Sequence, residues 1–293
     1  GRKNNEDRLA HSFSRDALLL VVADGMGGHY YGEVASQIAV QTLIDAFQQE
    51  ALPRLADPFM FLHKSINNAH NAIHDFSISN KLADSPRTTL VACIIQDNVA
   101  YWGHVGDSRL YMIRGGRTIC QTKDHSQVQA MVDEGLITPA QAEHHPDRNK
   151  VYNCLGGNHP PEVEYSRKTP LESGDLLVLC TDGIWGVAPG DTLAQALQGN
   201  DLMQSAPALM QQAERWGGPR GDNLSMIAVR WEENYTEMTQ SAVSTQTMGL
   251  EEVTTKLDEF GRNPNYKSEL SDDEIEKAIN EIRAAIDKYN IKK

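Results

Sequence analysis

The amino-acid sequence predicts an α+β fold in which the strands form hairpins and the helices are grouped separately. Apolar segments of strand length recur along the chain, and two of them, residues 89–96 and 98–105, are joined by a tight Asp97-Asn98 turn. Such a turn requires antiparallel pairing. The helical patterns lie in separate pairs and do not follow each strand in alternation, which favours α+β layering over βαβ units.

Each predicted element rests on its own pattern of apolar residues. In residues 32–49, Val34, Ile38, Leu43 and Phe47 lie on roughly one face of a helix. Alternating or continuous apolar runs indicate strands instead. The strands expected are residues 17–23, 89–96, 98–105, 109–114, 176–180 and 224–231. The helices expected are residues 32–49, 58–78, 191–197 and 202–215.

Two regions differ from this pattern in composition. Residues 120–165 are polar with one helical stretch at 127–134, and we expect them to form a flap beside the site. Residues 236–247 are rich in Ser, Thr and Gln and are typical of a linker. Two amphipathic helices are predicted beyond it. We therefore expect a first domain of residues 1–234 and a tail of residues 235–293, which contacts that domain or a neighbouring chain without supplying a metal ligand.

Composition excludes several classes of partner. The chain of 293 residues has a formal net charge of −13 and no long basic block, so neither nucleic acid nor an anionic membrane is expected as a partner. No apolar run approaches the roughly 20 residues that span a bilayer. None of the 4 cysteines belongs to a Cys-x-x-Cys pair. Buried free thiols in a reducing compartment, the cytoplasm, are the expectation.

Three aspartates carry the strongest chemical signal. Asp24, Asp182 and Asp222 each lie in a glycine- or asparagine-containing turn next to a predicted strand. A strand end is a rigid support, and glycine lets a ligand approach the backbone closely. Three such carboxylates suggest one oxygen-lined site for Mg²⁺ or Mn²⁺. Two such ions about 3.5–4 Å apart can activate a bridging water and hold phosphoryl oxygens.

Structural roles compete with the chemical ones. A single glycine-flanked aspartate is more often a turn or a helix cap, and a hairpin turn is the less favoured alternative for Asp107. Arg109 is expected to pair with a nearby acid. Arg2 is a candidate phosphate ligand, although an arginine close to a chain end is commonly solvated. His125 is expected to be a hydrogen-bonded structural residue more than a proton donor.

Taken in order, the motifs resemble those of the type 2C metal-dependent protein serine/threonine phosphatases of bacterial type, the PPM family. The resemblance covers about residues 1–231. Its motifs are Arg2…Asn5-Glu6-Asp7, Asp24-Gly25-Met26-Gly27-Gly28-His29, Thr88-Thr89, Gly106-Asp107-Ser108-Arg109, Asp124-His125-Ser126, Glu134-Gly135, Thr181-Asp182-Gly183 and Gly221-Asp222-Asn223.

The resemblance implies a four-layer α-β-β-α sandwich with two metal ions, Mn²⁺ or Mg²⁺, at one end, and a third, weaker ion. It implies that Asp24 bridges the two ions and that Arg2 binds the substrate phosphate; these are the two catalytic residues expected. The remaining metal residues implied are Gly25 through its carbonyl and Glu6 for the first ion or its waters, Asp182 and Asp222 for the second ion, and Asp107 with Asp182 for the third.

The sequence also departs from the family pattern. Met26 stands where some members place a histidine as general acid, so the general acid is not identified. Arg87 replaces a glycine before the Thr88-Thr89 pair. The first family strand, just before Arg2, is absent or truncated, and the tail has no counterpart in the phosphatase core.

Two functions follow from the resemblance. The first is hydrolysis of phosphoserine and phosphothreonine by a metal-activated water, with phosphorylated proteins as substrates and a serine/threonine kinase and its targets as partners; an antagonist of an anti-sigma factor is one such substrate. The second is a catalytically weak regulatory module that binds phosphoproteins. Metal-dependent hydrolysis of a phenyl phosphate distinguishes them.

Overall fold

Two antiparallel sheets lie face to face in the computed structural model, which describes residues 5–26, 31–142, 144–199, 201–218 and 221–232, and the backbone of 244–247. The first sheet has the strand order β11-β1-β2-β3-β4-β7, and β8 also pairs with β4. Its strands are β1 (Asp7–Phe13), β2 (Ala17–Asp24), β3 (Leu90–Gln96), β4 (Val99–Val105), β7 (Glu164–Tyr165), β8 (Thr169–Pro170) and β11 (Ser244–Thr247).

The second sheet has the order β10-β9-β5-β6. Its strands are β5 (Arg109–Arg114), β6 (Arg117–Gln121), β9 (Leu176–Cys180) and β10 (Met226–Arg230). The predicted Asp97-Asn98 turn is present between β3 and β4, with φ of 55° and 57°, and a second tight turn between β5 and β6 has φ of 57° at Gly115 and 75° at Gly116. Positive φ at both central residues is the hairpin geometry that matches the strand twist.

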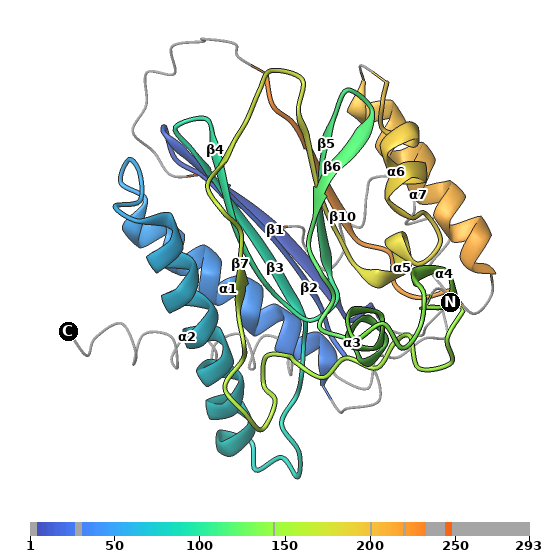
Figure 1. Ribbon diagram of the computed structural model, residues 1–293. Coiled ribbons are helices and arrows are strands. Elements are labelled where there is room, and N and C mark those ends of the chain that lie inside the picture. The colour runs from blue at the N-terminus through green and yellow to red at the C-terminus, as the bar shows by residue number, and fades with distance from the viewer. Residues whose placement is uncertain are drawn as a thin grey trace, which may run out of the picture.

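Helices cover the outer face of each sheet, which gives four layers (Figure 1). α1 (Gly32–Glu50) and α2 (Pro58–Ser79) pack on the first sheet, and α6 (Gly190–Ala196) and α7 (Leu202–Gly217) pack on the second. α2 begins at Asp57, whose carboxylate accepts hydrogen bonds from the backbone N–H groups of Phe59 and Met60. The predicted α+β sandwich is therefore confirmed.

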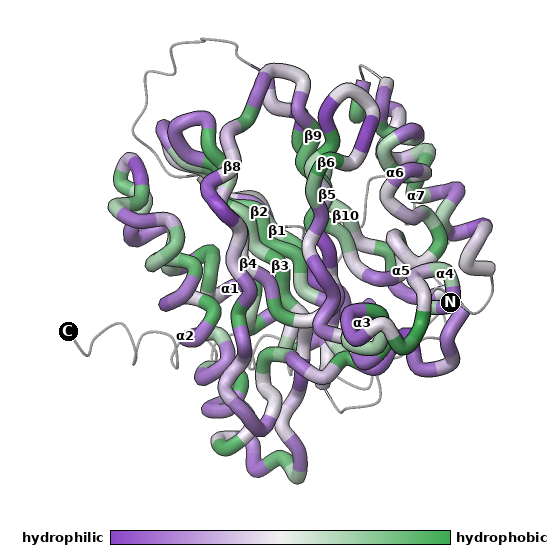
Figure 2. The backbone as a smooth tube through the Cα atoms, in the orientation of Figure 1, coloured by the Kyte–Doolittle hydropathy of each residue, from purple (hydrophilic) through white to green (hydrophobic). Residues whose placement is uncertain are grey.

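The continuous apolar runs in the sequence form strands that are buried on both faces. These strands lie in the middle of the molecule and are largely hydrophobic (Figure 2). All seven residues of β3 are buried. Successive side chains point to opposite faces, so Ala92 and Ile94 pack with α1 and α2, whereas Val91 and Cys93 face the second sheet. One strand thus contributes to two hydrophobic layers.

The segment of residues 120–165 begins within β6 and ends with β7, and its role as a flap stays a prediction. It contains α3 (Gln127–Asp133), capped by the hydroxyl of Ser126, and the short α4 (Pro139–Ala142). Thr88 and Leu155 exchange backbone hydrogen bonds of 3.2 and 2.9 Å, which fixes the end of the flap to the edge of the site. None of the described helices is long and apolar enough to cross a membrane.

The tail lies mostly outside the described residues, and so do its two predicted helices. Within the expected linker, the backbone of β11 pairs antiparallel with β1, with Thr247 opposite Ala10 and Ser244 opposite Phe13. Four residues of the linker are therefore a strand at the edge of the first sheet. The division between residues 234 and 235 stays a prediction.

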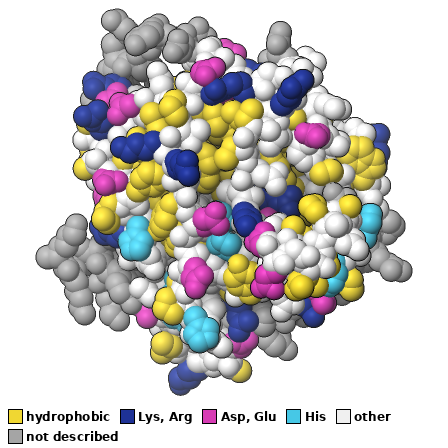
Figure 3. All heavy atoms as spheres, in the orientation of Figure 1, with side chains coloured by type: hydrophobic (Ala, Val, Ile, Leu, Met, Phe, Trp, Pro, Cys, Tyr) yellow, Lys and Arg dark blue, Asp and Glu magenta, His cyan; other side chains and the backbone are white. Residues whose placement is uncertain are grey.

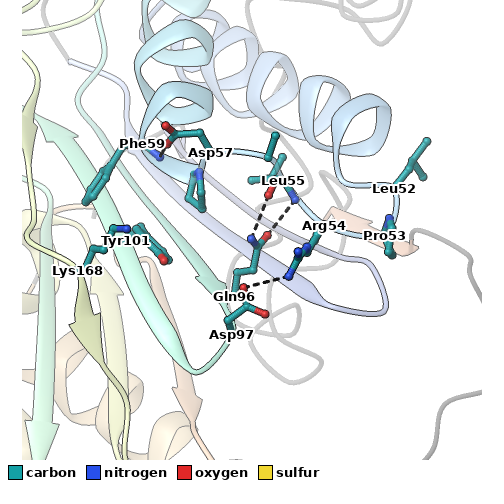
Figure 4. Close-up of a pocket in the computed structure, with 12 residues that line it drawn as sticks. Leu52, Pro53, Arg54, Leu55, Asp57, Phe59, Gln96, Asp97, Tyr101 and Lys168 are labelled. Carbon is teal, nitrogen blue, oxygen red and sulfur yellow. Dashed lines mark hydrogen bonds and ion pairs between the residues drawn. The ribbon is translucent and has the colours of Figure 1, made fainter.

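A pocket of about 510 Å³ lies at the end of the first sheet where β3 turns into β4 (Figure 4). The side chain of Gln96 holds its wall together, because it accepts a hydrogen bond from the N–H of Leu55 and donates one to the carbonyl of the same residue. None of the predicted site residues lines this pocket. On the face shown in Figure 3, acidic and basic side chains are interspersed.

Candidate metal centre

The first part of the acidic site lies where β1 begins and β2 ends. Asp7 pairs with Asp24 across these strands. The Gly25 N–H donates a hydrogen bond of 3.1 Å to the Glu6 carbonyl, so the residues outside the two strands also stay together. A side chain at Gly25 would overlap the backbone carbonyl of Gly32. The sequence therefore needs glycine at this position for α1 to approach the strand end.

The second part comes from one end of the other sheet. Cys180, the last residue of β9, pairs with Arg109 on β5 and with Met226 on β10. The segments next to these three residues are therefore neighbours. The acids in these segments are Asp107, Asp182 and Asp222.

Hydrogen bonds between the two sheets join both parts into one cluster. The Thr181 hydroxyl donates to Oδ2 of Asp7 over 2.9 Å. The N–H of Glu6 donates to Oδ1 of Asn223 over 3.1 Å. Acids from five separate segments of the chain therefore surround one point.

The loop that carries Asp107 is held closely against Asp24. Gly106 has φ of 100°, a left-handed conformation that favours glycine, and a Cβ there would lie 2.7 Å from the Cβ of Thr89. The hydroxyl groups of Thr89 and Ser108 are 2.7 Å apart, and the Thr89 hydroxyl accepts a hydrogen bond of 3.1 Å from the Asp24 N–H. The Asp107 loop and the end of β2 are thus one packed unit.

Burial and mutual repulsion make the cluster electrostatically unfavourable on its own. Burial raises the pKa of Asp24 well above its ordinary value, and the charges of Asp7, Asp182, Asp107 and Asp222 raise it further. Burial also raises the pKa of Asp107, with added repulsion from Asp182. The pKa of Asp7 rises to about 6, chiefly through burial. The carboxylates need an external positive charge to be ionised together.

The cation nearest to Asp107 in sequence supplies only part of that charge, because Arg109 lowers the pKa of Asp107 less than burial and the neighbouring acids raise it. The Arg109 guanidinium makes two hydrogen bonds of 2.7 Å to the carboxylate of Asp124 and lies 3.6 Å from the ring centre of Trp185. The predicted pairing of Arg109 with an acid is confirmed. Among the described residues, the groups that raise the pKa of Asp24 are all carboxylates. Carboxylate oxygens and a backbone carbonyl are the hard ligands that Mg²⁺ and Mn²⁺ prefer, so the donor set fits these ions.

The structure brings together four of the predicted metal residues, Asp24, Asp107, Asp182 and Asp222, through their mutual electrostatic interactions. Glu6 precedes β1, and its carboxyl carbon would lie 3.3 Å from a Cβ built on Gly32. Arg2 and His29 lie outside the described residues. The role of each residue as a ligand stays a prediction.

Sequence reasoning missed the residues that hold the acids in place. Thr181 was noted only as part of a motif, and the Trp185 indole, whose N–H donates over 2.9 Å to the Asp107 carbonyl, was not noted at all. Asp124 was not identified as the partner of Arg109. The only available signal was that Thr181 directly follows a buried strand and directly precedes Asp182.

The fold and the site define a class of protein: a four-layer α-β-β-α sandwich with a buried carboxylate cluster at one end, of the kind that binds divalent cations. The family model for protein phosphatase 2C matches residues 2–226 of the chain. The chain belongs to the protein phosphatase 2C family, and the predicted resemblance is confirmed.

Two related phosphatases match the same part of the chain. The Mycobacterium tuberculosis serine/threonine protein phosphatase PstP is 35% identical over 226 residues, which is 77% of this chain and 42% of PstP. The chain therefore spans less than half the length of this relative. The Listeria monocytogenes serine/threonine phosphatase stp is 32% identical over 231 residues, which is 78% of this chain and 90% of stp.

Solved structures agree with this assignment. A serine/threonine phosphatase of S. agalactiae superposes with a TM-score of 0.72 at 29% identity, covering 80% of this chain and 95% of that one. The catalytic domain of PstP in complex with two manganese ions superposes with a TM-score of 0.64 at 34% identity, covering 78% of this chain and 92% of that one.

Proposed function

We propose that this chain is a protein serine/threonine phosphatase that hydrolyses phosphoserine and phosphothreonine at a site holding two Mn²⁺ or Mg²⁺ ions. The observation that carries the proposal is the convergence of Asp7, Asp24, Asp107, Asp182 and Asp222, whose repulsion and burial call for cations. The named relatives support the same activity. They favour it over the alternative of a catalytically weak phosphoprotein-binding module.

Each residue has a distinct proposed part. Asp24, at the centre of the electrostatic cluster, would hold both ions. Gly25, through its carbonyl, and Glu6 would serve the first ion or its waters. Asp182 and Asp222 would hold the second ion, and Asp107 with Asp182 would hold a third, weaker one. Arg2 binds the substrate phosphate. PstP with its two manganese ions supports the count of two; the third ion rests on the position of Asp107 alone.

When bound, two divalent ions lower the pKa of a water molecule and neutralise charge on the phosphoryl oxygens. The residues of the chain supply the geometry. Thr181 fixes the Asp7 carboxylate by donating a hydrogen bond to it. Trp185 fixes the Asp107 backbone through its indole N–H. These rigid supports hold the oxygen ligands at strand ends, where small displacements of a reacting group reduce the rate strongly.

The proposed substrates are phosphorylated proteins, and the proposed partners are a serine/threonine kinase and its targets. The names of the relatives support this class of substrate. The four cysteines are free thiols, which supports a reducing compartment such as the cytoplasm. Residues 120–165 include Asp124 and His125, which bond to the Asp107 loop, and contact of this region with the protein part of a substrate is part of the proposal.

The test is hydrolysis of a phosphothreonine peptide. The chain should release phosphate with Mn²⁺ or Mg²⁺, lose this activity in EDTA, and regain it when Mn²⁺ is restored. Zn²⁺ should be a poor substitute, because the donors are all oxygen. Asp24→Asn serves as the matched control, since it keeps the size of the side chain and removes its charge. Full activity after exhaustive removal of metal would rule out the proposal.

A further inference from the structure

His125 lies between the loop that carries Asp107 and the flap. Its backbone N–H donates a hydrogen bond of 3.0 Å to the Gly106 carbonyl, and the Gly106 N–H donates one of 3.2 Å to Nδ1 of the His125 ring. The two residues therefore hold each other through both backbone groups of Gly106. His125 is buried, with 7% of the residue exposed, so water competes little for these bonds.

The flap is attached to the same ring atom. Asn153 donates from Nδ2 to Nδ1 of His125 over 2.7 Å, and the Tyr152 N–H donates to the His125 carbonyl over 3.0 Å. Asn153 is itself fixed, because its amide group exchanges two hydrogen bonds with the backbone of Glu162. One nitrogen atom thus accepts hydrogen bonds from the Asp107 loop and from the flap.

The neighbouring residue holds the other end of the loop. Asp124 binds the guanidinium of Arg109, two residues after Asp107. Asp124 and His125 therefore grip the segment 106–109 from both sides of Asp107. A displacement of this dipeptide moves the segment at both ends.

These bonds also fix the chemical form of the ring. Nδ1 accepts two hydrogen bonds, so the proton of the neutral ring is on Nε2. His104, Glu164 and His125 each place a potential ligand atom within 4.8 Å of the others. A metal ion on Nε2 would require the ring to lose that proton while Nδ1 still accepts both bonds. The ring of His104 stacks on that of His125 with the planes inclined by 25°, and its Nε2 is already bonded to the Lys123 carbonyl over 2.7 Å. The cluster of His104, Glu164 and His125 therefore has a structural role.

We propose that His125 is a positioning residue that makes the flap and the Asp107 loop one mechanical unit, so that a protein substrate pressing on the flap changes the position of the Asp107 carboxylate. The proposal rests on the proposed phosphatase function for its effect on turnover. The connection that His125 makes between the flap and the Asp107 loop does not depend on that function. The chemical class that would exploit it is a phosphorylated protein, which contacts the flap, and not a small phosphate ester, which does not.

The test uses two substitutions of nearly identical shape. His125→Asn keeps a hydrogen-bond acceptor close to the position of Nδ1, whereas His125→Leu removes this acceptor. Hydrogen exchange is measured on the metal-free chain. In His125→Leu the Gly106 amide should exchange roughly tenfold faster than in the wild type, and in His125→Asn it should stay within about threefold. An equal rate in the wild type and His125→Leu overturns the proposal.

Coupling is tested from the flap side and in turnover. Asn153→Leu removes the flap's donor and leaves His125 unchanged, so it also serves if His125→Leu does not fold. It should speed hydrogen exchange at the Gly106 amide as well as within residues 151–155. Faster exchange within residues 151–155 alone would show that His125 does not connect the flap to the Asp107 loop.

On a phosphothreonine peptide, His125→Leu should lower kcat in the wild-type background and change it little in an Asp107→Ala background. Effects that multiply would show that His125 does not act through Asp107. If neither the wild type nor any variant hydrolyses the peptide, the proposed phosphatase function is wrong. Hydrogen exchange then still tests whether His125 connects the flap to the Asp107 loop.

Discussion

Thr181 and Asp7 are joined by a hydrogen bond of 2.9 Å although 174 positions separate them in the chain. The bond runs from the end of the second sheet to the first residue of β1, and both residues are buried. The Thr181 hydroxyl also accepts a hydrogen bond of 3.2 Å from the Ser225 N–H. One side chain therefore sets the spacing between the acids of the two sheets.

Replacing Thr181 with Val tests this relationship, because the shape is kept and both hydrogen bonds are lost. Leaving the Asp7 carboxylate and the Ser225 N–H without this partner should reduce the free energy of unfolding by roughly 2 kcal/mol. The affinity for Mn²⁺ should fall as well. Thr181→Ser is the control and should restore most of both properties. Urea unfolding in EDTA gives the first quantity and calorimetry the second. A Thr181→Val chain with unchanged stability and metal affinity would contradict the structural role.

The raised pKa of Asp7 predicts a pH dependence of stability in the metal-free chain. Burial raises this pKa from 3.8 to about 6 in the folded state, so the folded chain holds the proton more strongly than the unfolded chain. The proton on Asp7 stabilises the folded chain fully below pH 4, and this stabilisation is lost as pH rises to about 6. The total loss is on the order of 3 kcal/mol. Asp7→Asn lacks this titration.

The measurement is the difference in the free energy of unfolding between Asp7→Asn and the wild type, taken in EDTA. The difference cancels the titration of buried groups such as His70, whose lowered pKa of about 4 acts in the opposite direction. It should grow in favour of Asp7→Asn between pH 4 and about 6 and then stay level. A difference independent of pH would show that Asp7 is not held in the environment described.

Asp182→Asn and Asp222→Asn test the second metal position. Each should leave the fold intact, because Asp182 is the first residue of the short helix α5 (Asp182–Trp185) and Asp222 lies in the loop before β10. Each should lower kcat on the phosphothreonine peptide by two or more orders of magnitude (~100-fold or more) and weaken one of two tight Mn²⁺ sites. Circular dichroism provides the check on folding. Near-normal turnover by a folded Asp182→Asn chain is not compatible with the proposed role.

Removal of the tail separates the proposed catalytic domain from the rest. A chain ending at Asn234 should keep its metal-dependent hydrolysis of a small phosphate ester, since every proposed ligand lies before residue 231. Loss of β11 leaves the edge of β1 open, and unpaired strand edges promote association between chains. Light scattering should therefore detect more self-association. A folded, truncated chain that no longer hydrolyses the ester would place the tail in the active site.

Local sequence patterns were sufficient for much of the fold. β9 is apolar throughout, and β2 and β3 are apolar up to their last residues, because each strand is covered on both faces; α1 and α2 show clear helical spacing. β1 and β6 were not predicted. β1 reads Asp-Arg-Leu-Ala-His-Ser-Phe and β6 reads Arg-Thr-Ile-Cys-Gln, and both contain several polar residues and are partly exposed. Their strand state depends on pairing with a neighbour, which no local pattern records.

The same division applies to the site. The turn around Asp24 marks it as chemically significant within a few residues of sequence. The bond between Thr181 and Asp7, and the grip of Asp124 on Arg109, depend on which strand ends meet in space. Side chains that position others carry no signal of their own, because the local sequence does not record which distant residue a buried polar group will bond.

The most direct test of the central claim is anomalous diffraction from crystals soaked in Mn²⁺. The account predicts two strong peaks about 3.5–4 Å apart inside the acidic cluster. Asp24 should touch both, the Gly25 carbonyl should be near one, and Asp182 and Asp222 should be near the other. No peak among these carboxylates, or peaks only beside His104 and His125, would contradict it.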